Sequence, residues 1–219
     1  MGVYTTLNPG SVALITIDMQ NDFVLPGAPA EIKGTYQVVP KMVRLIRAFR
    51  RAQKPVVHVV RLYLLNGSNV DLCRRELIRS GRKIVIPGTK GAELVDDLKP
   101  SKSIQLDSKL LLQGKVQRIG NQEFIIYKPR WGAFYRTPLE GFLKKRRIDS
   151  LVFCGCNFPN CPRTSLYEAS ERDLKLAIAT DAVSGFYDQG LRELERIGVW
   201  IRDTRGIVSW LNIGRNLAR

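Results

Sequence analysis

Three side chains suited to hydrolytic chemistry, Asp18, Lys128 and Cys161, stand where apolar segments of the sequence end. A thiol can attack a carbonyl carbon, and a carboxylate can accept the thiol proton and later deliver it to a leaving amine. An ammonium group can stabilise the negative charges of the carboxylate and of the thiolate. Ligands of open parallel sheets bind beyond the carboxyl ends of the strands. The sequence therefore predicts that these three residues meet at one edge of a sheet and form the catalytic site of a cysteine hydrolase.

The surroundings of Cys161 support its role as nucleophile. Pro162 lacks an N–H and favours the first turn of a helix, so Cys161 is predicted to cap that helix. The positive end of the helix dipole and the amine of Lys128 are expected to lower the pKa of the thiol. The backbone N–H groups of Asn157 and Cys161 are predicted to form an oxyanion hole, with unusual geometry at the peptide entering Asn157.

Aromatic and basic residues near the three strand ends are candidates for a substrate pocket. We predict a pocket lined by Phe23, Trp131, Phe134, Tyr135 and Arg163. The aromatic residues 131–135 fit a pocket wall and plain core about equally well. Arg163 and Arg130 are candidate partners for a substrate carboxylate, but each could instead face solvent or an oligomer interface.

The other cysteines and the single histidine offer less chemistry. Cys154 and Cys156 lie in or at the end of an apolar run and are expected to belong to the core. His58 stands among valines and is expected to be a hydrogen-bonded core residue. A zinc site normally needs four ligands at compatible spacing, which these residues do not offer. The sequence predicts no metal and no cofactor.

The composition is that of a globular protein with a basic surface. Of the 219 residues, 44% are hydrophobic, and 35 basic against 20 acidic side chains give a net charge of +15. The basic clusters are scattered and are not interleaved with stacking aromatics, so we expect a solvated surface and no nucleic-acid partner. The sequence has no apolar run long enough to cross a bilayer and no secretion signal. It predicts a cytoplasmic protein with free thiols and no membrane partner.

The elements that must position these residues alternate along the chain. Continuous apolar runs, typical of strands buried on both faces, predict strands at 12–17, 55–60, 123–127, 151–156 and 175–180, with a further strand at 199–202. Helices are predicted at 38–52, 71–80, 92–98, 137–146, 162–172 and 191–197. Residues 104–120 are left as an insertion or irregular segment. This order predicts one domain over residues 1–219 with an α/β fold, a doubly wound, mostly parallel sheet between two helical layers of Rossmann type.

Three segments of the sequence resemble the signature segments of the isochorismatase-like cysteine hydrolases. They read ALITIDMQNDF at 13–23, KPRWGAF at 128–134 and GCNFPNCPRT at 155–164. The resemblance extends from about Ser11 to Gly185 and preserves the order of the segments.

The resemblance implies roles for particular residues. It implies a triad of Asp18, Lys128 and Cys161, and a cis peptide between Cys156 and Asn157 that helps to form the oxyanion hole. It also implies a homo-oligomer, a dimer or tetramer, that acts on a small-molecule substrate. The family's substrates are mostly small amides, ureido compounds and nicotinamide, and some members cleave the vinyl ether of isochorismate.

Departures from the family pattern narrow this choice. Nicotinamidases resembling this chain bind a metal through an aspartate and histidines after the first motif, whereas residues 66–71 contain no histidine. Cys161 is retained, which favours C–N bond hydrolysis through a thioester. The resemblance thus predicts a metal-independent amidohydrolase for a small amide or ureido substrate. A vinyl ether hydrolase, or an inactive binding protein whose basic surface recruits an acidic partner, are the alternatives.

Overall fold

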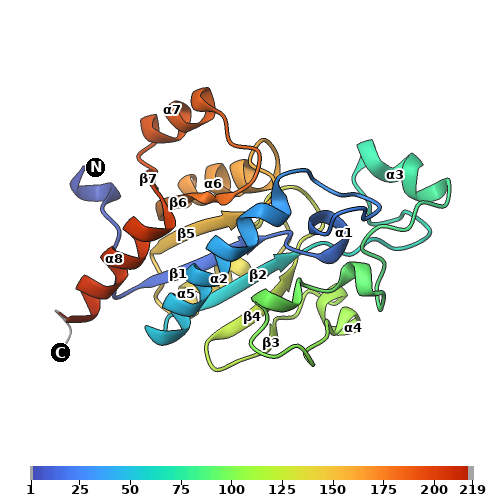
Figure 1. The fold of residues 1–219 in the computed structure, drawn as a ribbon, viewed down its shortest axis with the longest axis horizontal. Coiled ribbons are helices and arrows are strands. Elements are labelled where there is room, and N and C mark those ends of the chain that lie inside the picture. The colour runs from blue at the N-terminus through green and yellow to red at the C-terminus, as the bar shows by residue number, and fades with distance from the viewer. Residues whose placement is uncertain (1, 217–219) are drawn as a thin grey trace.

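The continuous apolar runs form the central strands of a seven-stranded sheet in a computed structural model that describes residues 2–216 (Figure 1). The strand order is β3-β4-β2-β1-β5-β6-β7, and every neighbouring pair is parallel except β3 and β4. The strands are β1 Val12–Ile17, β2 Val56–Val60, β3 Gln117–Arg118, β4 Glu123–Tyr127, β5 Ser150–Gly155, β6 Lys175–Val183 and β7 Trp200–Arg202. The predicted doubly wound, mostly parallel sheet is confirmed.

Helices cover both faces of this sheet. The chain steps from β1 to β2 in one direction and from β4 through β5 and β6 to β7 in the other, so right-handed crossovers place α2 on one face and α5, α6 and α7 on the opposite face. The α-helices are α1 Asn21–Val24, α2 Thr35–Arg51, α3 Leu72–Arg79, α4 Ser108–Leu112, α5 Leu139–Lys145, α6 Cys161–Ser170, α7 Asp188–Arg196 and α8 Thr204–Asn216. Short 3₁₀ helices are η1 Val3–Thr5, η2 Lys90–Ala92 and η3 Asp96–Leu98. Over residues 2–216, no helix combines the length and apolarity that a membrane span requires.

Three segments differ from the elements that the sequence predicts. The helix expected at 92–98 is interrupted, because Leu94 forms a β-bridge with Gln20 between η2 and η3. The segment 104–120 contains the short helix α4 and the antiparallel edge strand β3. The helix α8 was not predicted, although Ile207 and Leu211 recur at helical spacing and both are buried against the core.

The strand order creates a switch point at β1. β1 lies near the centre of the sheet, with β2 on one side and β5 on the other. The connection that follows β1 and the connection that follows β5 therefore run in opposite directions along the sheet. Ligands of doubly wound sheets bind at such a point, beyond the carboxyl ends of the strands. The four central strands β4, β2, β1 and β5 are followed there by Lys128, Arg61, Asp18 and the turn that leads to Cys161.

Candidate active site

Asp18 and Lys128 form a buried ion pair at this edge of the sheet. Lys128 Nζ lies 2.8 Å from Asp18 Oδ2, and the two side chains are 0% and 6% exposed. The amine also donates a hydrogen bond of 3.2 Å to the carbonyl oxygen of Arg130. Asp18 adopts a left-handed backbone conformation with φ of 55°, which aspartate tolerates better than most residues. The other oxygen, Asp18 Oδ1, is buried and has no hydrogen-bond partner among the described residues.

Cys161 is the first residue of α6 and not its cap as the sequence predicts, because Asn160 occupies the cap position. The charges of Asp18 and Lys128 act on its thiol. Its thiol is almost fully buried, and Arg61 Nη2 approaches Cys161 Sγ to 4.0 Å. Burial, followed by the negative charge of Asp18, raises the pKa of the thiol above its ordinary value, and the opposing charges of Lys128 and Arg61 do not compensate. This differs from the lowered pKa expected from the sequence, because burial of the thiol and the charge of Asp18 outweigh the effect of the two cations.

Hydrogen bonds tie the N-terminus of α6 to the loop that follows Lys128. Ser165 Oγ donates to the carbonyl oxygen of Cys161 at 2.7 Å and accepts from the N–H of Ala133 at 3.0 Å. Glu168 Oε2 accepts from the N–H of Phe134 at 2.8 Å. A Cβ atom at Gly132 would lie 2.1 Å from the Glu168 carboxylate, so only glycine permits this close approach. Ser165 thus joins the backbone at Cys161 to the backbone of the loop that follows Lys128.

The turn after β5 presents two free backbone donors. The N–H groups of Asn157 and Cys161 donate no hydrogen bond within residues 2–216. The cis peptide expected between Cys156 and Asn157 is not observed, since no described peptide bond is cis. Gly155, the last residue of β5, has a φ of 119° that is accessible to glycine, and the N–H of Phe158 bonds to the carbonyl oxygen of Ser184 at 2.8 Å.

The predicted pocket residues separate into two groups. Phe23 is buried and Trp131 is half-buried, and the guanidinium of Arg74 lies 5.7 Å and 5.4 Å from their respective ring centroids. Both aromatic side chains therefore lie against the same guanidinium and remain candidates for the wall of the site. Phe134 is also buried, with the Arg172 guanidinium 4.9 Å from its ring centroid.

Tyr135 and the two candidate arginines lie apart from this wall. Tyr135 is 46% exposed and is stacked by Arg136. Arg163 donates hydrogen bonds to Tyr187 and to Glu193 of α7. Arg130 donates to the backbone carbonyls of Asn69 and Pro129. The geometry gives no support for substrate binding by Tyr135, Arg163 or Arg130.

Arg61 is a site residue that the sequence reasoning missed. It is 1% exposed, and its Nη1 atom lies 2.7 Å from Asp71 Oδ2, which also accepts a hydrogen bond of 2.9 Å from the hydroxyl of Tyr63. Arg61 directly follows β2, as Asp18 follows β1 and Lys128 follows β4. The same strand-end rule that selects Asp18 and Lys128 would have selected Arg61.

The residues after β2 do not fit the metal site of the nicotinamidases. The carboxylate of Asp71 is already paired with a guanidinium, whose positive charge opposes a cation at that place. The histidine His58 lies on β2 inside the sheet, bonded to Thr16 and Glu123. Between residues 2 and 216, no group of three or more His, Cys, Asp or Glu side chains is arranged to hold a metal ion.

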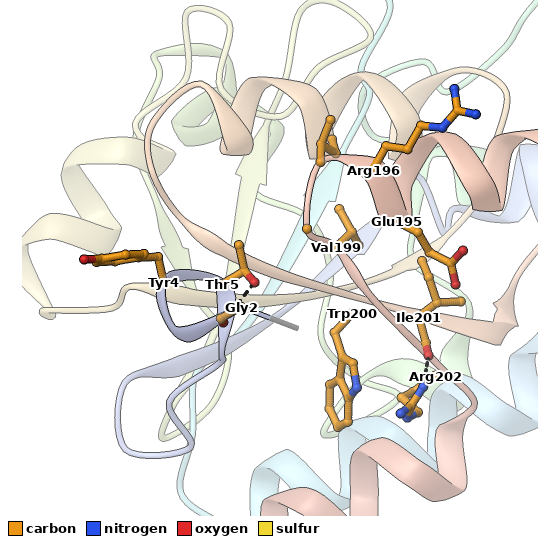
Figure 2. Close-up of a pocket in the computed structure, with 11 residues that line it drawn as sticks. Gly2, Tyr4, Thr5, Glu195, Arg196, Val199, Trp200, Ile201 and Arg202 are labelled. Atoms are coloured by element: carbon orange, nitrogen blue, oxygen red, sulfur yellow. Dashed lines mark hydrogen bonds between the residues drawn. The ribbon is translucent and has the colours of Figure 1, made fainter.

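A large cavity lies away from these residues. It has a volume of about 710 Å³ and opens between the N-terminal segment and the turn that connects α7 to β7 (Figure 2). Gly2, Tyr4 and Thr5 line one side, and residues 195–202 line the other. None of Asp18, Lys128 and Cys161 contributes to its wall, so this cavity is separate from the polar cluster at the switch point.

Fold and site together define a doubly wound α/β protein with a thiol, a carboxylate and an amine at its topological switch point. The profile of the isochorismatase domain matches residues 12–205. The chain belongs to the isochorismatase family, whose members include amidohydrolases.

Individual relatives agree with this assignment over most of their length. A probable inactive nicotinamidase of Arabidopsis thaliana is 32% identical over 196 residues, which cover 86% of this chain and 90% of that protein. The ureidoacrylate amidohydrolase RutB of Methylobacterium radiotolerans is 24% identical, over 94% and 82% of the two chains. The structure of an isochorismatase family protein from Desulfovibrio vulgaris superposes with a TM-score of 0.78 at 30% identity, over 92% of this chain and 98% of that one.

Proposed function

We propose that this protein is a cysteine-dependent, metal-independent hydrolase that cleaves a C–N bond in a small amide or ureido compound through a thioester. The observation that carries the proposal is the buried cluster of Asp18, Lys128 and Cys161, in which Asp18 Oδ1 remains free to accept a proton. A buried carboxylate oxygen without a partner is costly in a folded protein. A reacting thiol or a substrate N–H would supply the missing donor.

Each group has a defined part in the proposed reaction. Asp18 accepts the thiol proton, and the sulfur of Cys161 attacks the carbonyl carbon of the substrate. The free N–H groups of Asn157 and Cys161 stabilise the developing oxyanion. Asp18 returns its proton to the departing ammonia or amine, which leaves a thioester. Water, deprotonated by Asp18, then releases the acid and regenerates the thiol.

Lys128 serves this cycle by its charge. Its ammonium group lies 2.8 Å from Asp18 Oδ2, where it compensates the negative charge of the carboxylate and holds the side chain in position. Two similar proteins are consistent with C–N chemistry, since one is a ureidoacrylate amidohydrolase and the other, similar in fold, is an N-carbamoylsarcosine amidase.

The test measures ammonia release from a panel of small primary amides and ureido acids. We expect wild-type protein to turn over at least one compound, and Cys161→Ala to lose that turnover while its far-UV circular dichroism stays unchanged. Cys73→Ala is the matched control, because Cys73 is exposed and lies on α3. Ammonia release by Cys161→Ala at the wild-type rate would overturn the mechanism. Pyruvate release from isochorismate, with no ammonia released from any compound of the panel, would support the vinyl ether alternative.

A second candidate is a catalytically inactive member of the family. The observation that favours it is the name of the Arabidopsis relative, a probable inactive nicotinamidase at 32% identity. An inactive protein would turn over no compound of the panel. Turnover that depends on Cys161 excludes this candidate.

A further inference from the structure

Arg61 has a free hydrogen-bonding edge that faces the candidate nucleophile. Its Nη1 atom is occupied by Asp71 Oδ2 at 2.7 Å and by the carbonyl oxygen of Pro129 at 3.3 Å. Its Nε atom is buried without a hydrogen-bond partner among the described residues, and Nη2 has only the sulfur of Cys161 at 4.0 Å. Nε and Nη2 share one edge of the planar guanidinium, and that edge has the parallel N–H geometry that binds a carboxylate in bidentate fashion.

Arg74 adds a second guanidinium on the same side of the site. It lies over Trp131 and Phe23, and its Nη1 atom donates to the hydroxyl of Tyr63 at 3.3 Å. Trp131 also lies beneath the guanidinium of Arg61, at 5.2 Å from the ring centroid. The two cations are therefore held near one another on a shared aromatic side chain.

The charges of the site do not balance without a further anion. Lys128 is paired with Asp18, and Arg61 is paired with Asp71. Arg74 forms no ion pair with any side chain of residues 2–216, although it is half-buried. One positive charge in a partly desolvated site is costly unless a negative ligand compensates it.

We propose that the Nε/Nη2 edge of Arg61, together with Arg74, binds a carboxylate of the substrate, so that the substrate is a small acid with its amide or ureido group only a few bonds from the carboxylate. This inference rests on the proposed function and extends it to the substrate class. Arg61 orients the acid by its two parallel donors, and Arg74 supplies the unbalanced charge. Trp131 and Phe23 limit the space to a small molecule.

The test compares two alkylating agents that differ in charge and attack the same sulfur. Iodoacetate carries a carboxylate and iodoacetamide is neutral; in both reactions the sulfur of Cys161 forms a bond to the CH₂ carbon, iodide leaves, and the thiol proton is released. The measured quantity is the ratio of the iodoacetate rate to the iodoacetamide rate at Cys161. Cys73→Ser removes the exposed thiol, and N-acetylcysteine supplies the ratio of a free thiol.

We expect the ratio at Cys161 to exceed that of N-acetylcysteine by about tenfold or more, as for a charge-assisted hydrogen bond. Arg74→Gln should lower the ratio toward the free-thiol value. Arg61→Lys keeps the charge and the partner for Asp71 but removes the fork, and it should lower the ratio as well. Arg79→Gln makes the same charge change on an exposed position of α3 and should leave the ratio unchanged.

The outcomes separate this inference from the function on which it rests. If Arg74→Gln and Arg61→Lys slow both reagents equally, the arginines act on the thiol alone, which overturns carboxylate binding and leaves the cysteine mechanism standing. If wild-type Cys161 shows the free-thiol ratio, carboxylate binding is likewise overturned. If Cys161 reacts with neither reagent, the nucleophile assignment itself fails.

Discussion

Asp18 and Lys128 come from strands that are separated by β2, yet Lys128 Nζ reaches across to within 2.8 Å of Asp18 Oδ2 with both side chains buried. The pair neutralises two charges that the interior would otherwise disfavour. Removing one partner leaves the other uncompensated, and this cost commonly exceeds the net stabilisation that the intact pair provides.

Replacing Lys128 by methionine should therefore destabilise the fold strongly. We expect Lys128→Met to lower the free energy of unfolding by about 3–5 kcal/mol in urea titrations. Lys144→Met, which removes an exposed partner of Glu140, should leave the free energy of unfolding almost unchanged. The double variant Asp18→Asn/Lys128→Met should recover part of the lost stability without activity. Equal losses for Lys128→Met and Lys144→Met would contradict a buried pair.

The charge of Asp18 should be visible in the titration of Cys161. Burial and then the charge of Asp18 raise the pKa of this thiol, so Asp18→Asn should lower it. Lys128→Met removes an opposing positive charge and should raise the pKa further. The pH dependence of iodoacetamide alkylation, measured with Cys73→Ser to exclude the exposed thiol, reports both shifts. Shifts in the same direction for the two variants would show that Asp18 and Lys128 do not act on the sulfur through their charges.

Glu123 should contribute to stability at neutral pH and lose that contribution in acid. Its burial opposes ionisation, but hydrogen bonds from Arg50 and His58 outweigh this and hold the pKa of Glu123 below its usual value. A lowered pKa in the folded state gives stability that is present above about pH 4.3 and is lost as the pH falls through the folded-state pKa.

Thermal unfolding at several pH values tests this dependence. Glu123→Gln should be less stable than wild type at pH 7, and its midpoint temperature should fall less steeply below about pH 4.3. Glu31→Gln alters an exposed carboxylate and serves as the control. Parallel acid limbs for Glu123→Gln and wild type would refute a lowered pKa.

Gly155 should not tolerate a side chain. Its φ of 119° is unfavourable for other residues, and a Cβ atom there would lie 2.3 Å from the carbonyl oxygen of Ile17. Gly155→Ala should separate β1 from β5 at the point where Asp18 and Cys161 are positioned, with a large loss of soluble, folded protein. Gly141→Ala on α5 meets open space and should be neutral or slightly stabilising. The yield of folded protein and the urea midpoint are measured for both variants. Equal values for Gly155→Ala and Gly141→Ala would contradict the close approach of Gly155 to Ile17.

Much of the fold could be predicted because the central strands are short and continuously apolar. The run at 12–17 is β1 without a shift of boundary, and the run at 123–127 is β4. The edge strand β3 has only two residues, which give no periodic signal, although the turn that pairs it with β4 directly precedes that apolar strand. Helix α8 has apolar residues at helical spacing, Ile207 and Leu211, and this pattern was sufficient to predict the helix.

The site was predicted in part for a related reason. Asp18 and Lys128 are polar residues that end apolar strands, which makes them visible in sequence. Arg61 has the same position after β2, but its partner Asp71 lies ten residues away, beyond an irregular loop. Arg74 contacts the site only because α3 folds back over Trp131. The single domain, the homo-oligomer and the cytoplasmic location stay predictions.

The hydroxyl of Ser165 has a consequence for how this protein tolerates changes in chain length. It bonds to Ala133 on one side and to Cys161 on the other, so both ends of the stretch between them are anchored at the same point. Extra residues at the exposed turn near Arg146 and Arg147 would enlarge a loop whose ends stay in place. We therefore expect insertions at this turn to leave the position of the Cys161 thiol unchanged.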